Sequence, residues 1–142
     1  MLIKEIRNNY ESNEKLMNPI HEKALELLRR SAKKNYSYAS AKLGIAYFEG
    51  DFGLKINYGI AHDYLKNACF TGDVTAMCYY GWIYAMSLGF EQDKYKAKYW
   101  FEKSIENGYE YAYIPLYILS LDDSEAYGSS EYHKSQALKS IS

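Results

Sequence analysis

The chain has 142 residues, 48% of them hydrophobic and 25% charged, which is typical of one soluble globular domain and excludes a wholly disordered or fibrous chain. Seventeen tyrosines, with only nine glycines and two prolines, favour long helices over a loop-rich sandwich. A formal net charge of −1 gives no basic field to attract nucleic acid or anionic lipid. Neither nucleic acid nor a membrane is therefore an expected partner.

The start of the chain has no feature of an export signal. Residues 1–15 mix charges of both signs and contain no apolar run long enough for a signal peptide. No stretch approaches the roughly 18 apolar residues of a membrane helix, and two cysteines are too few for a disulfide framework. We expect a reduced, cytoplasmic protein.

The chain repeats itself. A shift of 37 residues superposes Ala24 on Ala61, Leu28 on Leu65, Ala39 on Ala76 and Gly44 on Gly81, and a further shift of 36 superposes Ala61 on Ala97, Gly72 on Gly108 and Ala76 on Ala112. Periods of this length are typical of a solenoid built from two-helix units. We expect a single helical-repeat domain over 1–142, divided into an N-terminal cap segment (1–18), a B helix (19–35), repeat 1 (36–72), repeat 2 (73–108), and a partial repeat with a C-terminal cap (109–142).

Apolar side chains within each unit recur at helical spacing. First helices, called A, carry Ala39, Leu43 and Tyr47, then Ala76, Tyr80 and Tyr84, then Ala112, Leu116 and Ser120; second helices, called B, carry Ala61, Tyr64, Leu65 and Ala68, then Ala97, Trp100, Phe101 and Ser104. Asn18-Pro19 is expected to open the first B helix, which runs to about Lys34. Asn57, Asp73 and Asp93 suit helix starts, and Gly72 and Gly108 suit left-handed helix ends.

Two glycines lie on the packed faces of the A helices. A side chain at Gly44 or Gly81 would stand between paired helices, so we expect leucine at either position to destabilise the fold by overpacking. The stretch from Ala68 to Tyr84, with alanine, glycine, alanine, a large apolar residue, glycine and tyrosine at fixed offsets, resembles the Sel-one-like repeat family, which is related to tetratricopeptide repeats. The resemblance implies an all-α fold, a right-handed superhelix (solenoid) of antiparallel helix pairs.

In tetratricopeptide-like solenoids the A helices line a concave face, so the resemblance directs attention to A-helix positions outside the core pattern. These are Tyr38, Ile45, Phe48 and Glu49 in the first unit, Thr75, Trp82, Ala85 and Met86 in the second, and Tyr111, Ile114, Ile118 and Leu121 in the third. The row is unusually apolar, which is typical of a surface that binds a protein or peptide. Trp82 and Tyr111 are the expected anchors.

Two alternatives remain open for this row. A helix from Met1 to Tyr10, or one from Ser130 to Ile141, would cover the groove from within the molecule. Self-association through the apolar row would give a homodimer.

The sequence gives little support for chemistry. His21, His62 and His133 lie far apart in the sequence without a metal or catalytic motif, so we expect no catalytic residue, metal site or cofactor, and a surface or capping role for His62.

Eight residues separate Cys69 from Cys78, whereas the disulfides of secreted, cysteine-rich relatives enclose seven, so we expect buried free thiols. The basic cluster, Arg29, Arg30, Lys33 and Lys34, is expected to be a solvated helix end, and the acidic Asp122, Asp123 and Glu125 a polar turn.

We expect a non-enzymatic protein interaction module that binds a polypeptide through its concave face. An immunity-type inhibitor of a toxin or effector is slightly favoured over a scaffold or adaptor, because an adaptor usually needs two binding faces and one apolar row stands out. A third hypothesis, implied only by the resemblance to secreted relatives, is a beta-lactam hydrolase or penicillin-binding protein.

Overall fold

The computed structural model describes the backbone of residues 2–142 and the side chains of residues 18–142. Across residues 2–142 the chain is helical and contains no strand, which confirms the all-α class. The elements are α1 (Leu2–Lys33), α2 (Ser37–Glu49), α3 (Tyr58–Phe70), α4 (Val74–Ala85), α5 (Lys94–Glu106), the 3-10 helix η1 (Glu110–Ala112), α6 (Tyr113–Asp122), α7 (Ser124–Tyr127) and α8 (Ser130–Ser140).

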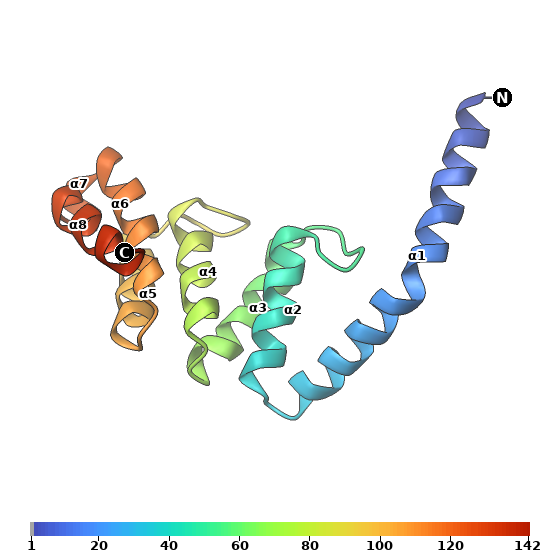
Figure 1. Ribbon diagram of the computed structural model, residues 1–142, viewed down its shortest axis with the longest axis horizontal. Coiled ribbons are helices and arrows are strands. Elements are labelled where there is room, and N and C mark those ends of the chain that lie inside the picture. The colour runs from blue at the N-terminus through green and yellow to red at the C-terminus, as the bar shows by residue number, and fades with distance from the viewer. Residues whose placement is uncertain (1) are drawn as a thin grey trace.

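The helices pack as consecutive pairs. Helix α2 contacts α3, α4 contacts α5, and α6 contacts α8, while the α3–α4 contact joins the first pair to the second. Figure 1 shows these pairs side by side in chain order, with α1 at one end of the stack and α6 to α8 at the other. The arrangement is the solenoid of helix pairs that the repeat predicts.

Side-chain size explains how closely the pairs pack. Leu43, Leu65, Phe101 and Leu116 are completely buried, and each occupies a stripe position of its repeat. Alanines occupy the buried positions where helix backbones approach, Ala39, Ala61, Ala68, Ala76, Ala97 and Ala112. Small residues at some buried positions and large ones at others allow the helices to pack closely, so the stripes identified in the sequence form the core.

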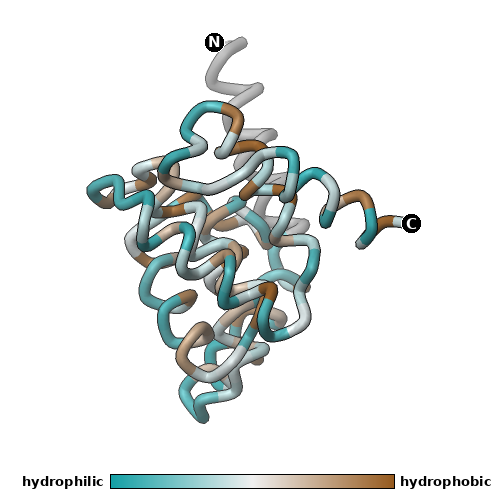
Figure 2. Tube along the Cα trace, turned by 90° about the vertical axis from the view of Figure 1, so that its left-hand side faces the viewer, coloured by the Kyte–Doolittle hydropathy of each residue, from teal (hydrophilic) through white to brown (hydrophobic). Residues whose placement is uncertain are grey.

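Apolar and polar residues interleave along the helices. Figure 2 shows hydrophobic and hydrophilic colours alternating over short distances along the tube. Among the described residues, no helix is both long enough and apolar enough to cross a bilayer.

The predicted helix boundaries of the repeats are confirmed. The side chains of Asn57, Asp73 and Asp93 accept hydrogen bonds from the backbone N–H groups three residues ahead, at 3.0, 2.9 and 2.9 Å. Gly72 and Gly108 have φ of +97° and +102°, in the left-handed region that favours glycine. Capping and termination are therefore local properties of each repeat.

Substituting Asp73 with alanine is expected to lower the free energy of unfolding by about 1 kcal/mol, because an N–H of the first turn of α4 loses its acceptor. The carboxylate also accepts from the Thr75 hydroxyl at 2.6 Å. Urea unfolding would measure the loss. Asp51→Ala is the control, because the exposed Asp51 side chain has no hydrogen bond among the described residues; equal losses in both variants would contradict the assignment.

Helix α1 differs from the predicted boundary. It runs from Leu2 through Pro19 to Lys33 as one helix, whereas we expected it to begin at Asn18-Pro19. Proline lacks an N–H donor and crowds the preceding turn, so it usually marks a helix start. Its fixed φ near −65° is nevertheless helical, and a long helix can continue through it at the loss of one hydrogen bond.

The C-terminal part forms a third helix pair. Helix α6 follows the 3-10 turn η1 and contains Pro115 in its first turn, where a backbone N–H has no partner within the helix. The repeat pattern decays after Leu116, yet α8 packs against α6 and buries His133. The short helix α7 separates the two helices of this pair, which explains why the period is lost in the sequence.

Candidate binding clefts

A cleft of about 540 Å³ lies between the A helices α2 and α4. We call it the α2–α4 cleft; it is lined by Phe48, Glu49, Tyr58, Cys78, Tyr79, Trp82, Met86, Leu88 and Tyr109. Four residues of the predicted apolar row meet here, namely Phe48, Glu49, Trp82 and Met86. The shared register of the two repeats places Phe48 and Glu49 near Trp82 and Met86, although more than thirty positions separate the two pairs in the sequence.

Aromatic rings form the walls of the α2–α4 cleft. Phe48 packs edge to face with Tyr58 and Tyr79, with ring centroids 5.4 and 5.1 Å apart. Trp82 is half-buried and packs edge to face on the core residue Phe101 at 5.7 Å. Phe48, Tyr79 and Trp82 all pack against the core, so these parts of the wall are formed before any ligand arrives.

Glu49 supplies the negative charge of this cleft. The Tyr79 hydroxyl donates to Glu49 Oε1 at 2.5 Å, and burial together with the Glu49 charge raises the pKa of Tyr79, so the phenol remains protonated and donates at neutral pH. None of the lining residues is basic. Among the residues with described side chains, Glu49 forms no ion pair.

The two cysteines are free, and they differ in position. Cys69 is buried in the core, as expected, but Cys78 is only half-buried and lines the α2–α4 cleft. Burial raises the pKa of the Cys78 thiol to about 12, and it raises that of Cys69 as well. Both sulfurs are therefore protonated at neutral pH and are poor nucleophiles.

The other predicted row residues do not line this cleft. Ile45 is half-buried against the core, and Ala85 is buried, so placing Ala85 on the exposed row was wrong. Helix α4 ends at Ala85 against the core, whereas its C-cap, Met86, is exposed. Tyr111 and Ile118 are about half exposed, on η1 and α6 respectively. The predicted row therefore does not form one continuous groove, because its residues on η1 and α6 lie apart from those that line the α2–α4 cleft.

Tyr38 lies at a second cleft, of about 460 Å³, between α1 and α2. We call it the α1–α2 cleft; it is lined by Leu27, Leu28, Ser31, Tyr36, Ser37, Tyr38 and Ala39. Tyr36 and Leu27 expose 61% and 53% of their surface, so its rim is apolar. We did not predict this cleft, because Leu27 superposes on Tyr64, a stripe position of a B helix, and such positions are expected to pack against neighbouring helices.

The C-terminal helix leaves both clefts open. Helix α8 packs against α6 and η1 and contributes no residue to the lining of either cleft. The interpretation in which residues 130–141 cover the groove is therefore wrong. The hypothesis that a helix from Met1 to Tyr10 covers the groove stays a prediction, because the side chains of these residues lie outside the described part of the chain.

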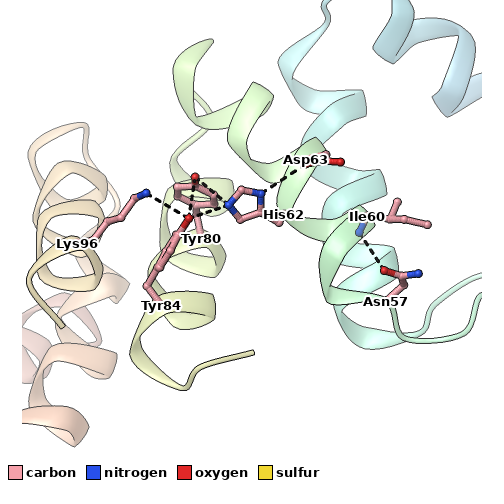
Figure 3. A network of polar contacts seen from close by, with 7 residues as sticks. All are labelled: Asn57, Ile60, His62, Asp63, Tyr80, Tyr84 and Lys96. Carbon is pink, nitrogen blue, oxygen red and sulfur yellow. Dashed lines mark hydrogen bonds and ion pairs between the residues drawn. The ribbon is translucent and has the colours of Figure 1, made fainter. Parts of the chain in front are cut away.

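His62 is buried, which corrects the expected surface or capping role. Figure 3 shows it pointing from α3 toward α4, where its Nε2 lies 2.8 Å from the Tyr84 hydroxyl and 3.2 Å from the Tyr80 hydroxyl. Its ring stacks on Phe90 at 4.0 Å, and Lys96 Nζ donates to Tyr84 at 3.2 Å. The histidine bridges the first repeat to the second because Tyr80 and Tyr84 lie one turn apart on the facing helix.

Acid is expected to weaken the fold through His62. Burial lowers the pKa of His62 in the folded state below the value of about 6.5 of an unfolded chain, so the unfolded state binds the proton more tightly. The contribution of His62 is therefore complete above about pH 6.5 and falls as the pH drops toward the folded pKa. Urea unfolding from pH 7.5 to 5 would show a smaller decrease for His62→Gln than for the wild type; identical decreases would contradict this.

The charged clusters have structural partners. Arg30 pairs with Glu26 at 3.0 Å, and Arg29 donates to the Tyr47 hydroxyl at 3.2 Å. Asp123 caps α7 and pairs with Lys94 at 2.7 Å, and both contacts lower its pKa. Among the described residues, no group of three or more acidic, histidine or cysteine side chains is placed to hold a metal ion.

Sequence reasoning missed several lining residues of the α2–α4 cleft. Tyr58 begins α3, Tyr79 lies on α4 beside a core position, and Leu88 and Tyr109 lie in connections between helices. The only signal in the sequence was the high tyrosine content, which does not say where the rings gather. Loop residues carry no helical period, so their convergence depends on the tertiary fold.

Comparison with known proteins gives the family. The model of the Sel1 repeat matches residues 21–36, 37–69 and 74–109, more than half of the chain. The chain belongs to the Sel1 repeat family. The second match covers the helix pair α2–α3 except for Phe70, and the third covers the pair α4–α5.

Two solved Sel1-type structures resemble this one. A Sel1 repeat protein from Oxalobacter formigenes is 26% identical with a TM-score of 0.68, covering 84% of this chain and 50% of its own. A protective antigen of uropathogenic Escherichia coli strains, which displays an SLR fold, is 25% identical with a TM-score of 0.69, covering 82% of this chain and 25% of its own. No curated protein matches the chain.

Membership of the Sel1 family explains the architecture but does not identify a partner. Sel1 repeat proteins generally mediate protein–protein interactions. The chain spans about half of one similar structure and a quarter of the other. A particular partner must therefore be argued from this chain's own surface.

Proposed function

We propose that this Sel1 repeat protein is a non-enzymatic interaction module that binds a polypeptide through the α2–α4 cleft. The observation that carries the proposal is the preformed aromatic wall of Phe48 and Trp82, beside Met86, which exposes 54% of its surface. Rigid aromatic side chains in a concave site are the usual anchors of protein interfaces. The protonated Cys78 and the lack of a histidine in the lining support binding rather than catalysis.

A scaffold or adaptor role gains support from the second cleft. The sequence slightly favoured an immunity-type inhibitor because a single apolar row stood out. The α1–α2 and α2–α4 clefts share no lining residue, and Tyr36 and Tyr38 expose more than half of their surface at the former. Two separate sites suit a protein that joins two partners, so we propose the adaptor role as the second candidate.

Site-directed photo-crosslinking in the native cell tests the proposal. A benzophenone amino acid at Met86 is expected to give a discrete crosslinked product, and one at Tyr95 is the control, because Tyr95 is 72% exposed on α5 and lines neither cleft. The same probe at Tyr36 distinguishes the candidates, since an adaptor would give a different product there. Equal crosslinking at Met86 and Tyr95 would contradict the proposal, and a crosslink between two copies would indicate a homodimer.

A further inference from the structure

The α2–α4 cleft combines aromatic rings with one carboxylate. Five of its nine lining residues are aromatic, Phe48, Tyr58, Tyr79, Trp82 and Tyr109, and Glu49 is the lining residue that carries charge at neutral pH. An aromatic face attracts cations through its quadrupole, and tryptophan does so most strongly. No lining residue is basic, so no lysine or arginine of the cleft itself competes with an incoming cation for the aromatic rings and the Glu49 carboxylate.

Elsewhere in the molecule, aromatic rings already have a cation. Lys96 Nζ lies 4.2 Å from the ring centre of Tyr84 and 5.9 Å from that of Tyr80, and Lys42 lies 5.6 Å from that of Tyr38. Among the described residues, no such pair involves a ring of the α2–α4 cleft. Of the two clefts, the α2–α4 cleft has more aromatic rings, and among the described residues none of those rings has a cation over it.

The Glu49–Tyr79 contact fixes where a cation would bind. The Tyr79 hydroxyl donates to Oε1 at 2.5 Å, which holds the carboxylate in place, while the other oxygen has no hydrogen-bond partner among residues 18–142. Glu49 is the last residue of α2, where the helix dipole adds negative potential. A donor that enters the cleft thus meets an oriented carboxylate beside the ring of Phe48.

An arginine side chain fits these features better than other organic cations. Its planar guanidinium can stack on an aromatic face while donating hydrogen bonds to a carboxylate, and it is less strongly hydrated than the ammonium of lysine. A trimethylated ammonium would interact favourably with the aromatic faces, but it has no N–H to donate to Glu49. Met86 and Leu88 provide apolar surface for the side-chain stem or for a neighbouring apolar residue.

We propose that the α2–α4 cleft binds an arginine side chain of the partner polypeptide, with the guanidinium on the Glu49 carboxylate and against the aromatic wall of Phe48 and Trp82. The proposal rests on the function proposed above and specifies what the partner must present. In this proposal Glu49 selects for the positive charge of arginine, and the rings of Phe48 and Trp82 provide the surface on which the guanidinium stacks.

Titration with short peptides tests the chemistry directly. The probe is acetyl-Gly-Leu-Arg-Leu-Gly-amide, added to the intact protein and followed by amide chemical shifts in NMR spectra up to millimolar concentration. The same peptide with citrulline, which has the shape of arginine without its charge, is expected to bind at least about tenfold more weakly, the usual order for losing a charged hydrogen-bonded contact. Equal binding of both peptides, absence of binding by the arginine peptide, or tighter binding of a trimethyl-lysine peptide would overturn the proposal.

A matched pair of variants locates the site. Glu49→Gln is expected to weaken the arginine peptide by about tenfold and to leave the citrulline peptide unchanged. Glu106→Gln is the control, because Glu106 is also exposed and is also the last residue of its helix, but it lines neither cleft. Equal weakening in both variants would indicate a general charge effect and would overturn the assignment to Glu49.

The two proposals fail in different ways. If the crosslink at Met86 persists with full yield in Glu49→Gln and the peptides do not discriminate, the cleft binds a partner but arginine is not what it recognises. If the probe at Met86 gives no more product than the probe at Tyr95, the proposed function itself fails, whatever the peptides show.

Discussion

Replacing Gly81 with leucine is expected to lower the free energy of unfolding by about 1–3 kcal/mol through overpacking. A Cβ atom at this position would lie 2.8 Å from Cε1 and 3.0 Å from Cδ1 of Phe101. Phe101 is completely buried and packs against Trp82, so its ring can move aside only by displacing other core side chains. Thermal unfolding should show a midpoint lowered by about 2–4 °C per kcal/mol for a chain of this size.

Gly59 offers a matched control for this prediction. It lies in α3 and is exposed, and a Cβ atom there would come no closer than 3.4 Å to another residue. Gly59→Leu should be neutral or slightly stabilising, because leucine favours the helix more than glycine does. Adding Phe101→Ala to Gly81→Leu should cost less than the two single losses combined, since the clash disappears; strict additivity or an unchanged midpoint for Gly81→Leu would contradict the packing.

The second large effect concerns binding. Trp82→Ala is expected to reduce the affinity for the crosslinked partner by at least about 2 kcal/mol, since central aromatic anchors carry much of the binding energy of an interface. Trp82 lines the cleft from α4, and its ring packs on the buried ring of Phe101. Titration of the purified partner with wild type and variant would measure the change.

The stability of the variant must be checked separately, because Trp82 also packs on the core. Circular dichroism at the titration temperature would show whether Trp82→Ala remains folded. Tyr111→Ala is a useful comparison: Tyr111 was the other expected anchor, but it lies on η1 outside the cleft and should lose much less affinity. Wild-type affinity in a folded Trp82→Ala would contradict the role of the cleft.

The location of His62 shows what sequence reasoning missed. We expected a surface or capping role for this histidine, because the sequence offers no partner for a metal ligand or a catalytic base. The aromatic rings of α4 and Phe90 extend far enough to cover it. Large side chains on the facing helix and in the following connection therefore bury this histidine, and the sequence of α3 alone does not show that they reach it.

The amino-acid sequence by itself determined the repeating helix pairs, their caps and the packed faces around Gly44 and Gly81, because each depends on residues close together in the chain and recurs at a fixed period. Only the tertiary structure decided that α1 continues through Pro19, that α8 closes a third pair, and that Tyr58, Tyr79 and Tyr109 join Trp82 around Glu49. These features depend on contacts between segments from different repeats, and no local pattern records which rings will meet.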